Sequence, residues 1–238
     1  GLSFPRVAER SRQEVPATEP ENRWCCAWIL VGPALLRHGG SGIPNKYSTD
    51  AHNWTAGALV FPSGPPAWVS NAVPGFDPGN WSWAPDVAFF NGKYHLYYSV
   101  SEWATIDSVI GLVTSPSLIA PTWTDQGKVV QSDAVGYTQP ETDTTAFNCI
   151  DPSILVDTNG NVWMSFGSYS SGILVTQLDP ATGRRLNTNS LMATLVANNA
   201  AGGGWGSTIE GSFLFQLFDY YYLFVNYCCC CAAINSTY

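Results

Sequence analysis

Two carboxylates, Asp151 and Glu210, occupy matching positions in two related stretches of the chain. Each follows an isoleucine at the start of an apolar segment, in IDPSI and IEGSF respectively. Two carboxylates that meet in one pocket can divide the acid and base roles, because their surroundings shift their pKa values apart. Asp151 and Glu210 are therefore our candidates for acid–base catalysis.

An internal repeat supplies the elements that would carry these carboxylates. Three segments share the order of apolar strand, turn and second strand: WAPDVAFFNGKYHLYYSVS (83–101), IDPSILVDTNGNVWMSFGSYS (150–170) and IEGSFLFQLFDYYYLFVNY (209–227). Asn91-Gly92 and Asn159-Gly160 are hairpin signals in the first two segments, because both residue types tolerate positive φ. The third segment lacks this signal.

Further apolar segments at 109–115 and 172–179 lie between the repeats, so each unit supplies about four strands. Repeated four-stranded units predict an all-β propeller, in which each sheet packs between its neighbours. The first strand of each sheet would start at the central channel, which would bring Asp151 and Glu210 to one axial pocket. A β-sandwich is the alternative, but it needs no such internal similarity.

A third acidic residue in the repeats, Asp86, has a different expected role. The alignment of the first strands puts Asp86 in one row with Ser153 and Ser212, one step beyond the row of Asp151 and Glu210. We therefore interpret Asp86 as a structural hydrogen-bonding residue.

The composition limits the classes of protein. Hydrophobic residues make up 45% of the 238 residues and charged residues only 12%, which excludes a disordered chain or a coiled coil. A net charge of −8 argues against a nucleic-acid partner, since phosphate binding needs a basic surface. No run of about 18 apolar residues exists, so we expect no membrane span.

The charge is concentrated at the start of the chain. Residues 1–23 hold charged side chains without an apolar period, and we expect a flexible polar tail followed by one domain over 24–238. The 7 Cys include four consecutive ones, Cys228–Cys231, whose pairing the sequence leaves open. Sequons at Asn53, Asn80 and Asn235 fit a secreted protein, although no signal peptide is visible.

Several motifs taken together resemble one enzyme family. They are WAPDV (83–87), LYYSVS (96–101), IGLVTS (110–115), NCIDPSI (148–154), FGSYSSG (166–172), IEGSF (209–213) and NSTY (235–238). In this order they resemble the five-bladed propeller glycoside hydrolases of family 43, and most of all the endo-1,5-α-L-arabinanases. The resemblance implies a partial propeller here, with about three blades and part of a fourth.

The resemblance implies inverting hydrolysis of α-1,5-L-arabinofuranosidic bonds in plant cell-wall arabinan. In that chemistry a general acid protonates the leaving oxygen and a general base activates water, roughly 6.5–9.5 Å away. A third carboxylate tunes the pKa of the acid. By motif, Glu210 matches the general acid and Asp151 the carboxylate that tunes its pKa.

The general base has no match. The family places an Asp, in a His-Asp-Pro motif, on the first strand of its first blade, but residues 1–49 contain no Asp. Glu19, followed by Pro20, is the nearest substitute, but we interpret it as a solvated residue of the polar tail.

The resemblance also implies substrate-binding residues. Trp83 would stack on a sugar ring, and its alternative is a buried Trp between blades. Trp103 stands where the family has an aromatic loop residue. Asn148, Ser168 and Tyr169 match loops that contact substrate.

No metal site or cofactor is required by the sequence. The resemblance makes a calcium ion in the central channel possible, but the histidine through which the family reaches it has no match. His38, His52 and His95 lack the spacing of metal ligands, and we interpret them as surface or strand residues.

Two other functions stay open. The unmatched base and the short chain fit a carbohydrate-binding propeller remnant without activity. A related pentosidase, such as a xylosidase or arabinofuranosidase, is the third possibility.

Overall fold

In the computed structural model, the regular secondary structure of the described residues consists almost entirely of strands. The described strands form four antiparallel sheets, with one short helix, α1 (Val69–Ala72). The all-β prediction is confirmed. No helix of the described segments is long and apolar enough to cross a membrane. The described residues are 29–30, 42–50, 52–103, 105–132, 147–167, 172–186, 193–196 and 209–227.

The largest sheet is a four-stranded meander made by the first repeat. It contains β4 (Trp83–Phe90), β5 (Lys93–Ser101), β6 (Ser108–Ser115) and β7 (Thr124–Gln131), in the order β4-β5-β6-β7. Each strand pairs antiparallel with the one before it, as expected for strands joined by short connections.

The second repeat forms a sheet of the same design. Its strands are β8 (Ser153–Val156), β9 (Val162–Phe166), β10 (Ile173–Leu178) and β11 (Ala193–Val196), again in sequential antiparallel order. The expected unit of four strands is therefore confirmed for the first two repeats.

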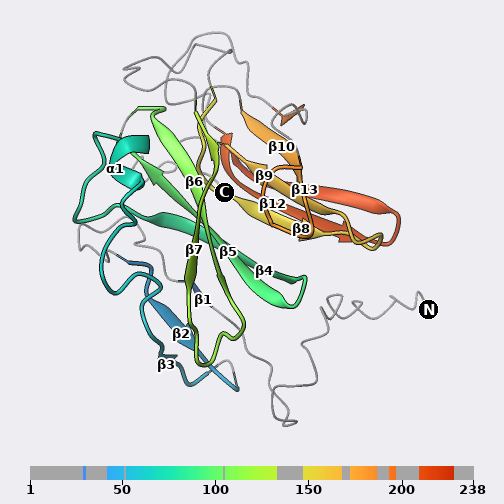
Figure 1. Ribbon diagram of the computed structural model, residues 1–238. Coiled ribbons are helices and arrows are strands. Elements are labelled where there is room, and N and C mark those ends of the chain that lie inside the picture. Colours follow the sequence, from blue (N-terminus) through green and yellow to red (C-terminus); the bar gives the residue numbers. More distant parts are fainter. Residues whose placement is uncertain are drawn as a thin grey trace.

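The remaining sheets are smaller within the described residues. The third repeat forms a hairpin of β12 (Ile209–Leu217) and β13 (Tyr220–Tyr227). Before the repeats, β1 (Ile29–Leu30), β2 (Asn45–Tyr47) and β3 (Thr55–Ala56) form a separate three-stranded sheet (Figure 1).

The hairpin turns follow the sequence signals only in part. Asn91 and Gly92 both have positive φ, 48° and 70°, as the Asn-Gly signal predicts. In the second repeat only Gly160 has positive φ, and the connection is longer because Asp157 accepts hydrogen bonds from the N–H groups of following residues. In the third repeat Phe218 takes the positive φ, 54°, in the turn.

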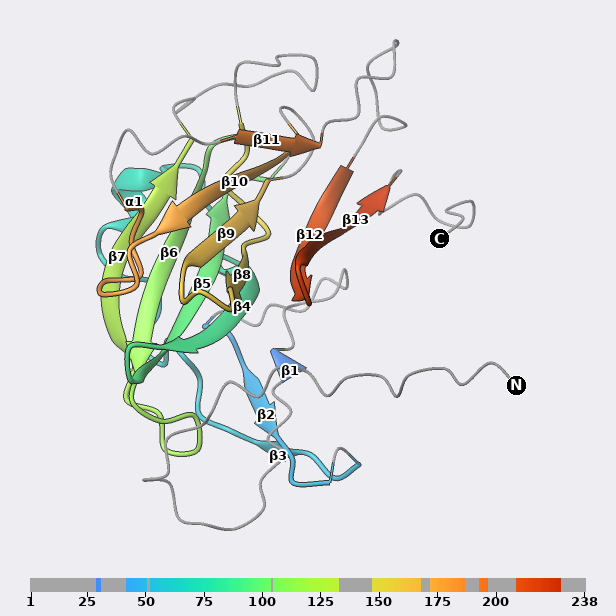
Figure 2. The ribbon, with the colours of Figure 1, turned by 90° about the vertical axis from the view of Figure 1, so that its right-hand side faces the viewer.

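The three repeat sheets are stacked as successive layers (Figure 2). Strand β8 contacts both β4 and β12. The β4–β7 sheet buries both of its faces, which agrees with a sheet packed between neighbours. One face contributes Leu96, Tyr98, Val100, Val109 and Val113 to a core with Phe61 and Trp81, and the other contributes Tyr97, Ile110, Leu112 and Val130 to a core with Met164 and Phe166.

Side chains of the expected structural row join one layer to the next. Oδ2 of Asp86 accepts a hydrogen bond from the backbone N–H of Ile154 at 2.7 Å. One layer further on, Oγ of Ser153 accepts from the N–H of Leu214 at 3.2 Å. The interpretation of Asp86 as a structural hydrogen-bonding residue is supported by this repeated contact.

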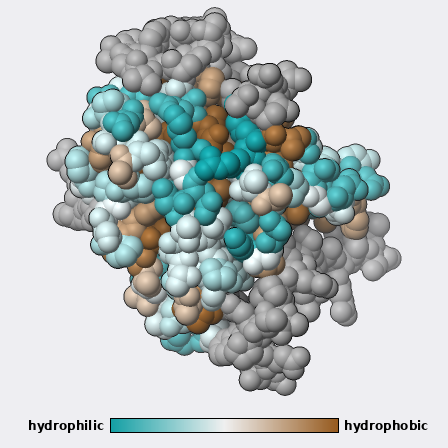
Figure 3. Space-filling model, in the orientation of Figure 1, coloured by the Kyte–Doolittle hydropathy of each residue, from teal (hydrophilic) through white to brown (hydrophobic). Residues whose placement is uncertain are grey.

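The β12–β13 hairpin covers the second sheet with one face and leaves the other face exposed. Cross-strand pairs place six apolar or aromatic residues on this outer face, since paired residues point to the same side of a sheet. They are Phe213, Phe215, Leu217, Tyr220, Tyr222 and Phe224. Tyr220 is 70% exposed and Phe224 59%. In the view of Figure 3, hydrophobic residues instead form separate patches that are surrounded by hydrophilic and neutral residues.

The described sheets do not close a ring, so the number of blades stays a prediction. The expected polar tail at 1–23 lies outside the described residues, as does most of 24–41.

Candidate active site

Asp151 lies immediately before the second sheet and is held by its backbone. Its N–H donates a hydrogen bond to Oγ of Ser99 at 3.0 Å, and Ser99 belongs to β5 of the neighbouring sheet. The preceding carbonyl, of Ile150, accepts from the N–H of Gly167 at 2.8 Å. Both polar groups of the 150–151 peptide therefore have partners, one from each of two sheets.

The backbone of Asp151 is in the left-handed region, with φ of 55°. The corresponding residue of the first repeat, Ala84, has φ of 42°. Both precede a proline, which narrows the conformations open to them. In the third repeat Gly211 corresponds to Ala84 by strand register, and here the glycine takes the positive φ, 60°. The repeats thus reach the same bend with different residues.

The bend brings Asp151 to the segment that holds Glu210. The N–H of Gly211 donates a hydrogen bond to Oδ2 of Asp151 at 3.2 Å. Burial and then the nearby Glu210 carboxylate raise the pKa of Asp151, the Gly211 hydrogen bond lowers it, and the net value is about 6. The structure therefore brings the two candidate carboxylates close enough to influence each other.

Glu210 is positioned by a bulge at the start of β12. It pairs across the strand with Asn226, and the register then shifts before the next pair, Phe213 with Phe224. Bulges of this kind redirect a side chain. Nδ2 of Asn226 donates to Oε1 of Glu210 at 3.4 Å, which adds a weak contact to the carboxylate.

The same bulge occurs in the first sheet, between Trp83 and Asp86. By pairing, Trp83 opposite Ser99 corresponds to Glu210 opposite Asn226. Glu210 therefore corresponds to Trp83 by register. The positive φ values match Asp151 with Ala84 and Gly211 instead, so the expected equivalence of Asp151 and Glu210 is wrong by one residue.

The two predicted tryptophans lie together. The rings of Trp83 and Trp103 have centroids 5.9 Å apart and planes tilted by 39°. Trp103 is 69% exposed, so its ring is accessible to a ligand. Trp83 pairs with Ser99, whose hydroxyl contacts the backbone of Asp151, and this places the pair at the same end of the sheets as the carboxylates.

Asn148 is buried, with 7% exposure, and is tied into the protein. Its Oδ1 accepts a hydrogen bond from Oγ of Ser108 at 2.7 Å, while the N–H of Cys149 donates to the same Ser108 oxygen at 2.8 Å. In this structure Asn148 anchors the segment that leads to Asp151. Its expected contact with substrate stays a prediction.

Other expected site residues lie outside the described residues. These are Ser168, Tyr169 and Glu19, and the cysteine run 228–231 is also among them.

A histidine-held channel metal does not fit the residues that the structure describes. No group of three or more His, Cys, Asp or Glu that could hold a metal occurs among them. His52 lies in an exposed turn. His95 is buried against Phe90, with ring centroids 3.7 Å apart, and desolvation lowers its pKa to about 4. We therefore derive no step through a metal.

Sequence reasoning did not identify Ser99, Gly167 or Asn226 as residues of the site. Ser99 lies within the LYYSVS motif, which could have marked it as a residue of the site. Its partner, Asp151, is 52 residues away. The contact depends on how two sheets pack, and no local pattern encodes it.

The layered four-stranded meanders, with paired carboxylates where successive sheets meet, have the features of a propeller-type glycoside hydrolase. The family model described as "Glycosyl hydrolases family 43" matches residues 34–238. The chain belongs to this family.

Characterised relatives and solved structures agree with this membership. The extracellular endo-alpha-(1->5)-L-arabinanase 1 of Bacillus subtilis (strain 168) is 38% identical over 212 residues, 89% of this chain and 59% of the relative. Native Bacillus subtilis arabinanase Arb43A has a TM-score of 0.69 and 34% identity, covering 92% of this chain and 70% of that one. The Cellvibrio cellulosa alpha-L-arabinanase complexed with arabinohexaose has a TM-score of 0.66 and 32% identity, covering 81% and 60%. The chain thus spans about three fifths of the first relative's length.

Proposed function

We propose that this protein hydrolyses α-1,5-L-arabinofuranosidic bonds in arabinan with inversion, using Glu210 as general acid and Asp151 as the carboxylate that tunes it. One observation carries the proposal: the hydrogen bond from Gly211 to Asp151, which puts Asp151 beside the residue that follows Glu210. The family membership and the names of the relatives support the reaction class and the substrate.

The proposal gives the shared proton to Glu210, whereas the raised pKa in the structure, about 6, belongs to Asp151. Two carboxylates in one site resist simultaneous ionisation, because each negative charge disfavours the other. One proton is therefore retained more readily than on an isolated carboxylate. In the proposed step Glu210 gives its proton to the glycosidic oxygen as the bond to the sugar breaks, and the negative charge left on Glu210 is repelled by Asp151.

The attacking water needs a general base, for which the sequence has no matching Asp, and Glu19 is the acidic residue to test for that role. It is an acidic residue upstream of β1, in the part of the chain where the family's base would lie. Replacing Glu19 with Gln tests this role separately from that of Glu210.

The sugar would bind on the Trp83–Trp103 pair, with Asn148, Ser168 and Tyr169 as further proposed contacts. The exposed Trp103 ring offers an apolar face for a furanose. An extracellular location is proposed with this substrate, in agreement with the extracellular relative. For the fold, we propose that the three repeat sheets are consecutive blades of a five-bladed propeller.

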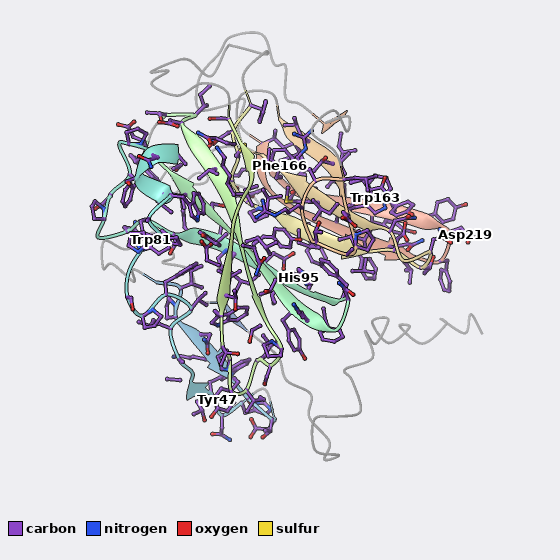
Figure 4. All side chains as sticks on the ribbon, viewed as in Figure 1. Tyr47, Trp81, His95, Trp163, Phe166 and Asp219 are labelled. Carbon is purple, nitrogen blue, oxygen red and sulfur yellow. The ribbon has the colours of Figure 1, made fainter. Side chains whose placement is uncertain are left out.

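The test is the release of reducing ends from linear, debranched arabinan by the full chain. Glu210→Ala should abolish release, and proton NMR of the first products should show the inverted anomer. Asp219→Asn is the matched control, because Asp219 is exposed at the opposite end of the same hairpin (Figure 4). Equal activity of Glu210→Ala and the parent chain would exclude Glu210 as the acid.

A carbohydrate-binding protein without hydrolysis is the second candidate, favoured by the absence of Asp from residues 1–49. It predicts that the folded chain binds arabino-oligosaccharide by calorimetry but releases no reducing ends. Hydrolysis that depends on Glu210 would exclude it. Faster release from aryl xylosides than from arabinan would instead indicate a related pentosidase.

A further inference from the structure

The position of the Asp151 carboxylate depends on the orientation of the peptide group between residues 150 and 151. The 150–151 peptide leads into a residue with φ of 55°, a region that is unfavourable for a non-glycine residue unless its surroundings hold it there. Something in the fold must therefore stabilise this conformation. The hydrogen bonds of the peptide identify what does.

The two hydrogen bonds of this peptide have partners in different parts of the fold. The carbonyl of Ile150 is bonded within its own sheet, to the N–H of Gly167 at 2.8 Å. The N–H of Asp151 is bonded across sheets, to Oγ of Ser99 at 3.0 Å. Ser99 is fully buried, so water does not replace its hydroxyl. A side chain of the first sheet thus fixes the plane of the peptide that aims Asp151.

The other end of Asp151 reaches the third sheet, where its carboxylate accepts from Gly211. Ser99, Asp151 and Gly211 therefore form one chain of contacts across three successive sheets. If the first contact is lost, the Asp151 backbone can relax toward ordinary φ and its carboxylate can turn away from Glu210.

We propose that Ser99 is a positioning residue of this site: its hydroxyl orients the 150–151 peptide so that the Asp151 carboxylate stays beside the Glu210–Gly211 segment. The role rests on the proposed function, in which Asp151 must act on Glu210. Ser99 contacts the backbone N–H of Asp151, so it would act on the carboxylate indirectly.

The experiment compares three changes at Ser99 with a matched control. Ser99→Ala removes the hydroxyl. Ser99→Thr and Ser99→Val have nearly the same shape as each other and differ in the hydroxyl, so this pair separates the hydrogen bond from packing. Ser165→Ala is the control, because Ser165 is equally buried and bonds across sheets to Oγ of Ser212 at 3.0 Å without contacting Asp151.

The first measurement is the titration of the Asp151 carboxyl carbon by NMR in the full chain. In Ser99→Ala and Ser99→Val we expect the pKa of Asp151 to fall from about 6 toward its ordinary value of 3.8, as the carboxylate leaves its buried place beside Glu210. Ser99→Thr and Ser165→Ala should titrate like the parent chain. The second measurement is the rate on arabinan, where kcat should fall by about 10- to 100-fold with KM little changed.

The role of Ser99 is overturned if the Ala and Val variants titrate like the parent, or if Ser165→Ala shifts the Asp151 titration equally. Loss of folding in both the Ala and Val variants would also overturn it, since Ser99 would then serve stability alone. A parent chain without hydrolysis would contradict the proposed function, while the titration would still decide whether Ser99 positions Asp151.

Discussion

The N–H of Gly211 donates a hydrogen bond to the Asp151 carboxylate at 3.2 Å, although the two residues are 60 positions apart. This contact joins the entry of the second repeat sheet to the first strand of the third. It sets Asp151 against the segment that carries Glu210.

Asp151→Asn should remove activity but stabilise the protein at neutral pH. The pKa of Asp151 is raised to about 6 in the folded state, against 3.8 for an ordinary Asp. Between these values the folded state keeps a proton that the unfolded state has lost, so the free energy of unfolding falls as pH rises through about 4 to 6. At pH 7 the neutral Asn should therefore add about 1–3 kcal/mol. Thermal melts at pH 7 and pH 4 check this; a gain of equal size at both pH values would contradict it.

Asp86→Ala should destabilise the protein without a direct effect on the reaction. Oδ2 of Asp86 accepts from the N–H of Ile154, and removing it leaves that donor without this partner, at a cost of about 1–3 kcal/mol. Asp86→Asn keeps an acceptor oxygen and should lose less. Urea denaturation measures both, with kcat taken well below the melting temperature. A large fall in kcat for a fully folded Asp86→Asn would point to a role in catalysis instead.

Trp103→Ala should weaken substrate binding and leave stability almost unchanged. The ring is 69% exposed, so few packing contacts are lost, while a sugar would lose one aromatic surface. Aromatic contacts of this kind contribute about 0.5–1.5 kcal/mol, which corresponds to roughly a 2- to 10-fold weaker Kd for arabinohexaose. Calorimetry measures the Kd, and Phe218→Ala, an exposed aromatic in the β12–β13 turn, is the control. Equal Kd values for both variants would remove Trp103 from the binding site.

His95→Phe should reduce the loss of stability in mild acid. Desolvation lowers the pKa of His95 to about 4 in the folded state, from 6.5. Between these values the unfolded state binds the extra proton, so wild-type stability falls as pH decreases from about 6.5 to 4. A phenylalanine keeps a ring against Phe90 but does not titrate. Melting temperatures over this range test the effect, with the exposed His52→Gln as control. Parallel curves for the parent and His95→Phe would show that other groups dominate.

The sequence by itself determined the strand repeats, the Asn91-Gly92 turn and the family. Apolar segments and the need for positive φ are local properties, so they can be read from neighbouring residues. The candidates Asp151 and Glu210 were also accessible, because the repeat predicts that the starts of successive sheets meet, although the two residues differ by one position in register.

Only the tertiary structure decided how those residues are held. Ser99 reaches Asp151 across 52 residues, and strand register matches Glu210 with Trp83 rather than with Ala84, to which Asp151 corresponds. Asn148 is buried against Ser108, which its motif did not indicate. These relations arise from the docking of one sheet on the next, and the energy that fixes them comes from contacts between distant segments. No periodicity within a single strand encodes such contacts.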